Sequence, residues 1–406
     1  MSIGDVSEYQ LREQVRAWCA ATIPADWRER QRGADHHEYI AFQRWWRDAL
    51  ADAGYFIPHW PRLWGGVEMT LPAQVVLYEE LSRCDAPRLG ITQVSVFNAA
   101  PAIMHAGTAE QQQRFLPAIA SGQIWCQGFS EPNAGSDLAA LGTTAVRDGD
   151  NYIVNGQKIW TSMAREADQC ILLARTDPDA PKNKGISFFV MDMHSRGVDV
   201  RPIKNLVGDS EFCETFMDDV VIPAENLIGA ENAGWTVSQA TLGSERAVAL
   251  IGLAELLRRN GRDFLVEIAA GWTMPDGSPV LDDSSVREAI GGLYGEVEIL
   301  RLVLTRMVTN LIQNGGAGPE ASVVKIFYSE LLQRLMKFAS ELHGLPGQLL
   351  QPGVPSSGWE THDFARDFIH SYSWTIGGGT NEIMRNIVGE QVLGLGREPR
   401  PEGMKR

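Results

Sequence analysis

The chain of 406 residues has few cysteines, no surplus of positive charge and no long apolar run. The five cysteines include no Cys-x-x-Cys pair and are spread along the chain: Cys19, Cys84, Cys126, Cys170 and Cys213. This odd-numbered, scattered set argues against a disulfide framework or a zinc site and favours reduced cytosolic thiols. Lys and Arg number 36 against 51 Asp and Glu, a formal charge of −15, which argues against a general binder of nucleic acid or anionic membranes.

Signals for export or membrane insertion are lacking as well. The first eighteen residues contain acidic side chains and no apolar run, unlike a signal peptide. The most apolar stretch, 247–257, is too short to span a bilayer and is interrupted by Glu255. We therefore expect a cytoplasmic protein with no membrane span.

Several common catalytic motifs are also missing. The chain has no Gly-x-Gly-x-x-Gly after a strand, no His-Glu-x-x-His and no Gly-x-Ser-x-Gly. The run Gly377-Gly378-Gly379 lacks the lysine of a phosphate-binding loop and is by itself more typical of a turn. The eight histidines are scattered, so we expect no metal site.

What is present is a chain of ordinary globular composition, 44% hydrophobic and 21% charged, long enough for two or three domains. Apolar spacing predicts a helical zone to about residue 121, a zone of short β-rich segments to about 230, and long helices thereafter. We expect an α+β fold rather than a Rossmann fold, with an all-α domain at 1–121, an antiparallel β-domain at 122–230 and a helical domain at 231–406.

Individual elements follow from the same patterns. Helices are expected at 36–53, 72–81, 109–119, 233–265, 284–313, 319–343, 360–374 and 380–393. Strands are expected at 152–154, 171–174, 186–191 and 220–222, separated by turns at 148–150 and 155–156. The β-domain is then a small barrel or sandwich.

Three segments carry more specific information. They are Phe129-Ser-Glu-Pro-Asn-Ala-Gly-Ser-Asp-Leu138, Asn155-Gly-Gln-Lys-Ile-Trp-Thr-Ser162 and Gly379-Thr-Asn-Glu-Ile-Met-Arg-Asn-Ile-Val-Gly-Glu390. In this order and spacing they resemble the acyl-CoA dehydrogenase family, over nearly the whole chain. The resemblance implies a helical domain, a β-domain and a second helical domain, with FAD between the last two. It also implies removal of an α-proton from an acyl-CoA and transfer of the β-hydrogen to the flavin as hydride, giving the trans-2-enoyl-CoA.

The resemblance assigns roles to residues of these segments. Phe129 and Ser130 would contact the pyrimidine edge of the flavin, where donors stabilise the charge of the reduced ring. Trp160 would pack on the ring, with Thr161 beside it and Ser162 near N5. By the same resemblance, the cofactor would also be contacted by Thr380 and Glu382. The acyl-CoA would be bound by Ser136 and Arg246. Taken singly, Trp160 is more often a core aromatic and Ser130 a turn cap; their joint occurrence favours the site.

The usual catalytic base of the family is missing. Most members carry a glutamate just before the Gly-Thr of the third segment, but this chain has Gly378 there. A minority branch places its glutamate before an arginine on a helix of the last domain, which matches Glu245-Arg246. The apolar neighbours of Glu245 would raise the pKa of its carboxylate and so its basicity, although a solvent-facing glutamate is the commoner case. We predict Glu245 as the base, with the backbone N–H of Gly378 as a donor to the thioester oxygen.

Two other family segments are replaced. Family homotetramers complete the FAD site of a neighbouring subunit with Arg-x-x-Phe-Gly and Gln-x-x-Gly-Gly-x-Gly segments, where this chain has 270–277 and 341–347. Glu341 would place a carboxylate near a pyrophosphate, and Pro346 removes a backbone donor. The pattern resembles the base-bearing chain of actinobacterial α2β2 steroid side-chain acyl-CoA dehydrogenases. A heterotetramer with a second acyl-CoA dehydrogenase chain is therefore expected, with a homotetramer as the alternative.

The sequence thus predicts an FAD-dependent acyl-CoA dehydrogenase for a bulky or branched acyl-CoA, possibly a steroid side chain. By resemblance, an electron-transfer flavoprotein would accept the electrons. A flavin acyl-CoA oxidase and a non-catalytic subunit of a heteromeric dehydrogenase remain as alternatives. The retention of Ser130, Trp160, Ser162 and Glu245 argues against the second of these.

Overall fold

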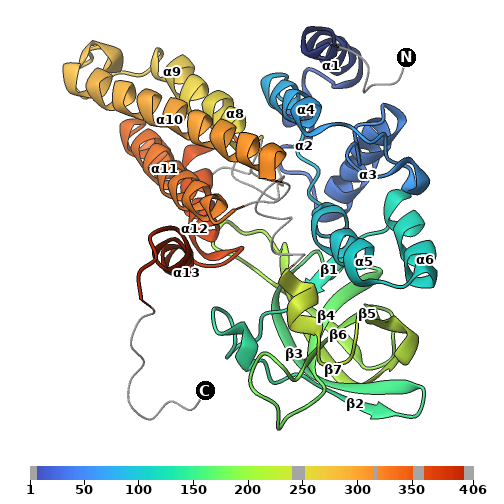
Figure 1. The fold of residues 1–406 in the computed structure, drawn as a ribbon. Coiled ribbons are helices and arrows are strands. Elements are labelled where there is room, and N and C mark those ends of the chain that lie inside the picture. The colour runs from blue at the N-terminus through green and yellow to red at the C-terminus, as the bar shows by residue number, and fades with distance from the viewer. Residues whose placement is uncertain (1–6, 240–251, 315–317, 351–360, 397–406) are drawn as a thin grey trace. The chain divides into compact units, whose positions relative to one another are not determined.

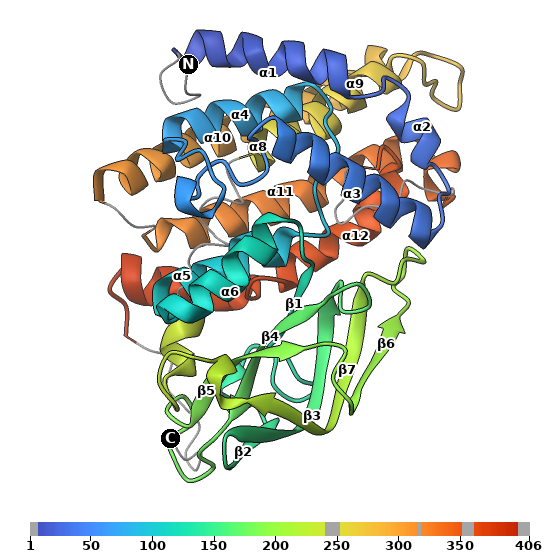
Figure 2. The same cartoon turned by 90° about the vertical axis from the view of Figure 1, so that its right-hand side faces the viewer.

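The computed structural model describes residues 7–239, 252–314, 318–350 and 361–396. Packing divides these residues into two compact units, each described by itself (Figures 1 and 2). The helical unit contains residues 7–62, 66–88 and 252–396, and the β unit contains 63–65 and 89–239. The N-terminal helices are divided between the two units, so the three domains predicted at 1–121, 122–230 and 231–406 stay a prediction.

The first helices of the helical unit are α1 (Glu8–Thr22), α2 (Trp27–Gln31), α3 (His36–Asp52) and α4 (Leu71–Arg83). Capping boxes begin α1 and α3, at Ser7 with Gln10 and at Asp35 with Glu38. The patterns at 36–53 and 72–81 correctly predicted α3 and α4. The sequence patterns did not predict α1 as a separate helix. It buries only a narrow stripe at every fourth residue, formed by Leu11, Val15 and Cys19.

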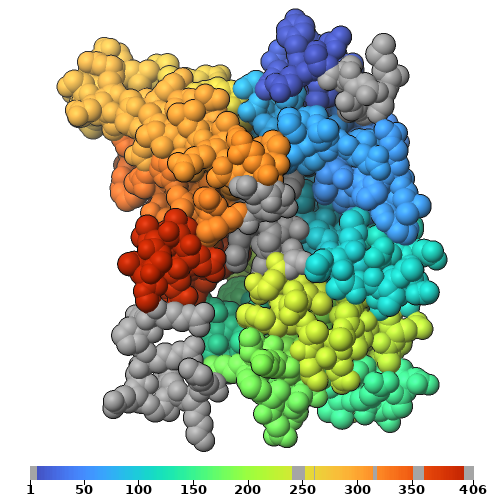
Figure 3. All heavy atoms as spheres, in the orientation of Figure 1, coloured from blue at the N-terminus to red at the C-terminus, as the bar shows by residue number. Residues whose placement is uncertain are grey.

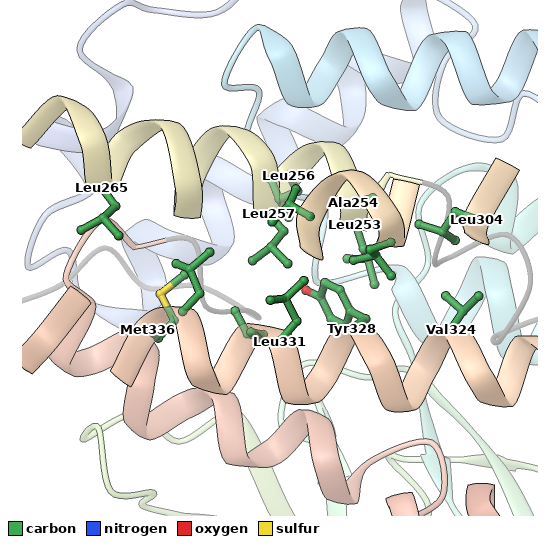
Figure 4. Close-up of a cluster of buried hydrophobic side chains, with 14 of the residues drawn as sticks. Leu253, Ala254, Leu256, Leu257, Leu265, Leu304, Val324, Tyr328, Leu331 and Met336 are labelled. Atoms are coloured by element: carbon green, nitrogen blue, oxygen red, sulfur yellow. The ribbon is translucent and has the colours of Figure 1, made fainter. Parts of the chain in front are cut away.

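The C-terminal helices of the same unit are α8 (Leu253–Leu256), α9 (Phe264–Ala269), α10 (Ser284–Asn314), α11 (Glu320–Leu342), α12 (Phe364–Ile376) and α13 (Asn381–Ile387). Their core follows the length of α11, where Val324, Tyr328 and Leu331 meet leucines from the α8 region (Figure 4). The helix predicted at 233–265 differs in its described part, since a π-helical stretch, Leu257–Asp263, separates α8 from α9. A Cβ at Gly261 in that stretch would lie 3.1 Å from Leu335 Cδ2, so the backbone passes close to α11 there.

The β unit is built on one sheet of eight strands with the order β6-β7-β3-β2-β4-β5-β8, and β1 pairs with β4. Its elements are α5 (Ala100–Ala106), α6 (Ala109–Ala120), β1 (Trp125–Gly128), β2 (Thr144–Asp148), β3 (Asn151–Ser162), β4 (Gln169–Arg175), β5 (Ile186–Asp192), β6 (Val198–Ile203), β7 (Phe212–Pro223) and β8 (Leu227–Ile228). The predicted strands and the helix at 109–119 are present. Pairing is antiparallel as predicted, except that β1 and β2 each run parallel to β4.

The turn predicted at Asn155-Gly156 is wrong. These residues lie inside β3, where the register against β7 shifts between Val154 and Gly156. A Cβ at Gly156 would lie 2.5 Å from Thr143 Oγ1, so the neighbouring chain leaves room only for glycine. The dipeptide marks a bulge in a continuous strand rather than a hairpin turn.

Candidate active site

In the β unit, the first two motif segments lie against each other. The N–H of Ile159 on β3 donates to the carbonyl of Ser130 at 2.9 Å. The Lys158 ammonium donates to the Phe129 carbonyl at 3.1 Å and to Glu131 Oε1 at 2.8 Å. The loop that follows β1 is therefore bonded to the strand that carries Trp160, Thr161 and Ser162.

A buried ion pair closes this junction. The Lys158 side chain is 1% exposed, and Glu131 also accepts the N–H groups of Gly142 at 2.6 Å and Thr143 at 2.9 Å. Burial alone would raise the pKa of Glu131, but the Lys158 charge and these bonds outweigh it and lower the pKa. Burial lowers the pKa of Lys158, and the Glu131 carboxylate opposes that shift only in part. The Lys158 ammonium as donor and the Glu131 carboxylate as acceptor thus belong to one hydrogen-bonded network.

Trp160 is strained and exposed. Its φ is +60°, a left-handed conformation that is unfavourable for an aromatic residue, and its side chain stands at a second register shift of β3. The residue is 58% exposed, and its ring meets Phe212 edge-on at 6.2 Å. A core aromatic would be buried, so exposure excludes that interpretation. Such strain costs about 1–3 kcal/mol and is concentrated at functional sites.

The other predicted residues of the β unit differ in exposure. Phe129 is buried and packs edge-on against Phe188 at 6.0 Å, and Ser162 is half-buried. Thr161 is buried, and its Oγ1 has no hydrogen-bond partner among the described residues. Ser136 is exposed.

In the helical unit, the predicted residues gather at the start of α13, which lies at the surface of that unit (red in Figure 3). Gly378 and Gly379 have φ of +67° and +96°, and Thr380 caps α13 by accepting the N–H of Ile383 at 3.3 Å. The Glu382 side chain is 78% exposed and lies 3.8 Å from Arg385. The left-handed backbone at Gly378 disfavours any side chain there, including a catalytic glutamate.

A buried polar network anchors this loop to α11. Lys325, 7% exposed, donates from Nζ to the Gly379 carbonyl and to Asn381 Oδ1, both at 2.8 Å. Asn381, 3% exposed, donates in turn to Ser329 Oγ at 3.0 Å and Glu330 Oε1 at 3.2 Å. One helix face thus fixes both ends of the Gly379-Thr380-Asn381 turn.

Replacing Gly378 with alanine is expected to destabilise the protein by about 1–3 kcal/mol, because alanine is strained at φ +67°. The matched control is Gly291→Ala, in mid-α10, where an added Cβ meets no atom within 4 Å. That change should raise the free energy of unfolding by about 0.5–1 kcal/mol, because alanine is favoured over glycine inside a helix. Urea denaturation measures both; equal stability of Gly378→Ala and the wild type would contradict the left-handed loop.

Not every site residue could be placed. Glu245 and Arg246 lie outside the described residues, so the predicted base stays a prediction. The sequence patterns assigned no role to four residues of the buried networks: Lys158, Glu131, Lys325 and Asn381. The available signal was a lysine within an apolar stripe: Lys325 lies between Val324 and Tyr328, both buried on α11.

Comparison with known proteins decides the family. The N-terminal, middle and C-terminal domains of acyl-CoA dehydrogenases match residues 7–123, 126–220 and 232–393. The chain belongs to the acyl-CoA dehydrogenase family. It is therefore an oxidoreductase with the three-part architecture of that family, as the motif order predicted. Among the described residues, no helix has the length and apolarity to cross a membrane.

Individual acyl-CoA dehydrogenases align along almost the full chain. IpdE1 of Mycobacterium tuberculosis is 35% identical over 402 residues, which are 97% of this chain and 99% of the relative. The solved structure of the Tcur3481-Tcur3483 steroid ACAD has a TM-score of 0.81 at 30% identity, covering 98% and 100% of the two chains. The ChsE4-ChsE5 complex of M. tuberculosis has a TM-score of 0.78 at 30% identity, covering 96% and 98%.

The segments 270–277 and 341–347, which were predicted to replace family FAD contacts, pack on each other in this acyl-CoA dehydrogenase. The Trp272 indole stacks on the His343 imidazole, with ring centroids 4.2 Å apart and planes 8° from parallel. Glu341 forms an ion pair with Lys337 one turn earlier on α11. A Cβ at Gly347 would lie 2.3 Å from the Ser340 carbonyl oxygen. Aromatic stacking and close packing thus occupy the segments that were matched by sequence to the family motifs.

The β-unit residues, in contrast, fit a flavin. An exposed tryptophan in a strained conformation offers an aromatic face, and the Ser130 N–H has no acceptor among the described residues. Both are groups that a planar, hydrogen-bonding ring would use. FAD, when bound, supplies the hydride acceptor, and this chain would hold it with Phe129, Ser130, Trp160, Thr161 and Ser162.

Proposed function

We propose that this protein is an FAD-dependent dehydrogenase that converts an acyl-CoA to the trans-2-enoyl-CoA. The observation that carries the proposal is the bonded junction of the Ser130 loop with β3, which presents the strained, exposed Trp160. Thr380 and Glu382 add contacts to FAD from the start of α13. Loss of flavin absorbance when acyl-CoA is mixed anaerobically with the enzyme, with enoyl-CoA as product, tests this function directly.

The substrate chemistry requires a base and a donor. The α-proton of a thioester is weakly acidic, so Glu245 removes it while the thioester oxygen takes a hydrogen bond. The Gly378 N–H serves as that donor: among the described residues it has no acceptor. Ser136 and Arg246 bind the acyl-CoA, and an electron-transfer flavoprotein takes the electrons onward.

The acyl group is proposed to be bulky or branched, with a steroid side chain as the leading candidate. Two independent observations support this substrate class. The predicted base, Glu245, is far along the chain from the usual position, which is Gly378 here, so it would approach the α-carbon from another side. A structural relative at 30% identity, the Tcur3481-Tcur3483 protein, is a steroid ACAD.

In a panel of CoA esters, we expect a branched or ring-bearing acyl-CoA to exceed octanoyl-CoA in kcat/KM by at least about tenfold, the scale set by apolar-pocket discrimination. Steady-state assays with an artificial electron acceptor measure the ratio. The control is the enoyl-CoA product of each ester, which should cause no reduction of the artificial acceptor. Highest kcat/KM with octanoyl-CoA would refute the substrate proposal and leave the dehydrogenase proposal intact.

The working enzyme is proposed to be a heterotetramer with a second acyl-CoA dehydrogenase chain. The Trp272–His343 stack supports this assembly, because the packed segments of this chain leave a neighbour's FAD without the family donors. The ChsE4-ChsE5 complex is in addition a relative that assembles from two different chains. A homotetramer is the alternative assembly.

Two other functions remain testable. An acyl-CoA oxidase would pass its electrons to dioxygen, so steady oxygen consumption with acyl-CoA would favour it over the dehydrogenase. A non-catalytic subunit would bind neither flavin nor acyl-CoA productively in any assembly. The strained Trp160 argues against this role, since a subunit without a cofactor gains nothing from the strain.

A further inference from the structure

Two buried lysines occupy matching positions in the two groups of site residues. Lys158 Nζ donates to the carbonyl of Phe129, the residue just before Ser130, at 3.1 Å. Lys325 Nζ donates to the carbonyl of Gly379, the residue just before Thr380, at 2.8 Å. Ser130 and Thr380 are the residues proposed to contact FAD. In both groups, a lysine therefore holds the peptide that ends in a cofactor residue.

Holding a carbonyl also sets the direction of the next amide. The structure contains no cis peptide bond among the described residues, and in a trans peptide the C=O and the following N–H point in opposite directions. Because each lysine holds the carbonyl on its own side, the N–H groups of Ser130 and Thr380 point away from the lysines. Among the described residues, neither N–H has an acceptor.

The charge of each lysine adds to this effect. Both side chains are almost removed from water, and a buried ammonium is tolerated only when hydrogen-bonded. A cation on a carbonyl polarises the peptide group, which makes its N–H a stronger donor in a medium of low dielectric. Second contacts hold each ammonium in place: Glu131 for Lys158 and Asn381 for Lys325.

We propose that Lys158 and Lys325 are positioning residues, which aim and polarise the Ser130 and Thr380 amides toward the flavin. The inference rests on the proposed function. It predicts that the lysines matter most when the flavin is reduced, because a donor is worth more to the form that carries negative charge.

The test compares Lys158→Met and Lys325→Met with two surface controls, all as full chains in the FAD-loaded assembly. Lys204→Met is the control in the β unit, where Lys204 is exposed. Lys337→Met is the control on α11 itself, 55% exposed in its side chain. Dye-equilibrated titration gives the midpoint potential of the flavin, and hydrogen exchange of the FAD-free chain follows peptides covering 128–134 and 377–384.

Each buried variant should weaken the binding of reduced FAD about tenfold more than that of oxidised FAD, which lowers the potential by about 30 mV. Amide exchange in the matching peptide should quicken, while both controls stay at wild-type values. A potential equal to that of the controls would overturn the proposal. If a methionine variant does not fold, the matching Lys→Gln variant decides, since glutamine keeps a donor without the charge: it should lower the potential, and an unchanged potential again overturns the proposal.

The exchange measurement separates this inference from the proposed function. If the wild-type chain, alone or with a partner chain, binds no FAD, the proposed function fails. Amide exchange then still tests the positioning role: unchanged exchange in the lysine variants rejects it, and faster exchange confined to the matching peptide supports it.

Discussion

Replacing Glu245 with glutamine is expected to slow flavin reduction by acyl-CoA by about 10²–10⁴-fold, the usual contribution of a general base, while FAD stays bound. Glutamine keeps the size of the side chain but cannot accept the α-proton. Gly378 stands in place of the usual glutamate with φ +67°, where a side chain is strained, and this supports a base from another part of the chain. Stopped-flow absorbance of the flavin after anaerobic mixing measures the rate.

The matched control is Glu267→Gln on α9, an exposed glutamate of the helical unit, and its flavin should be reduced at the wild-type rate. Wild-type flavin reduction in Glu245→Gln would remove the base assignment. The Arg246 assignment can be tested separately, since loss of a substrate contact raises KM while a lost base lowers kcat.

Expressed alone, this chain is expected to purify with little FAD, at an affinity lower by roughly two to four powers of ten than that of a complete site. The segments 270–277 and 341–347 lack the arginine and the glycine amides that family members direct to a neighbour's FAD. Charge-assisted hydrogen bonds contribute about 1.5–3 kcal/mol each, so the loss of two accounts for this range. In these segments Trp272 and His343 stack on each other, so their side chains are less available to replace the missing donors.

Co-expression with an acyl-CoA dehydrogenase chain that carries Arg-x-x-Phe-Gly should give a yellow heterotetramer with about two FAD per four chains, one for each complete site. Size-exclusion chromatography with absorbance at the flavin band measures mass and occupancy together. Saturating the lone chain with added FAD is the control for loss during purification. One FAD per lone chain would reject the heterotetramer proposal without touching the dehydrogenase proposal.

Local patterns predicted much of the fold, because a repeat of buried side chains is a property of neighbouring residues. The apolar spacing in 36–53 predicted α3, and the short β-rich run at 186–191 predicted β5 almost to the residue. Patterns failed where a distant segment decides the backbone. The Asn155-Gly156 turn became a bulge because Thr143 approaches it, and the helix predicted at 233–265 contains a π-helical stretch against Leu335.

By itself, the sequence determined the family and the order of helical and β-rich zones, and it predicted the segments of the candidate site, since these depend on residue type and spacing along the chain. Only the tertiary structure showed that Trp160 is strained and exposed, and that Trp272 and His343 stack. It also brought Lys158 and Lys325 to carbonyls that lie 29 and 54 residues away in the chain. The physical reason is that a buried ammonium is stabilised by whichever acceptors folding places beside it, and no local pattern records which ones those are.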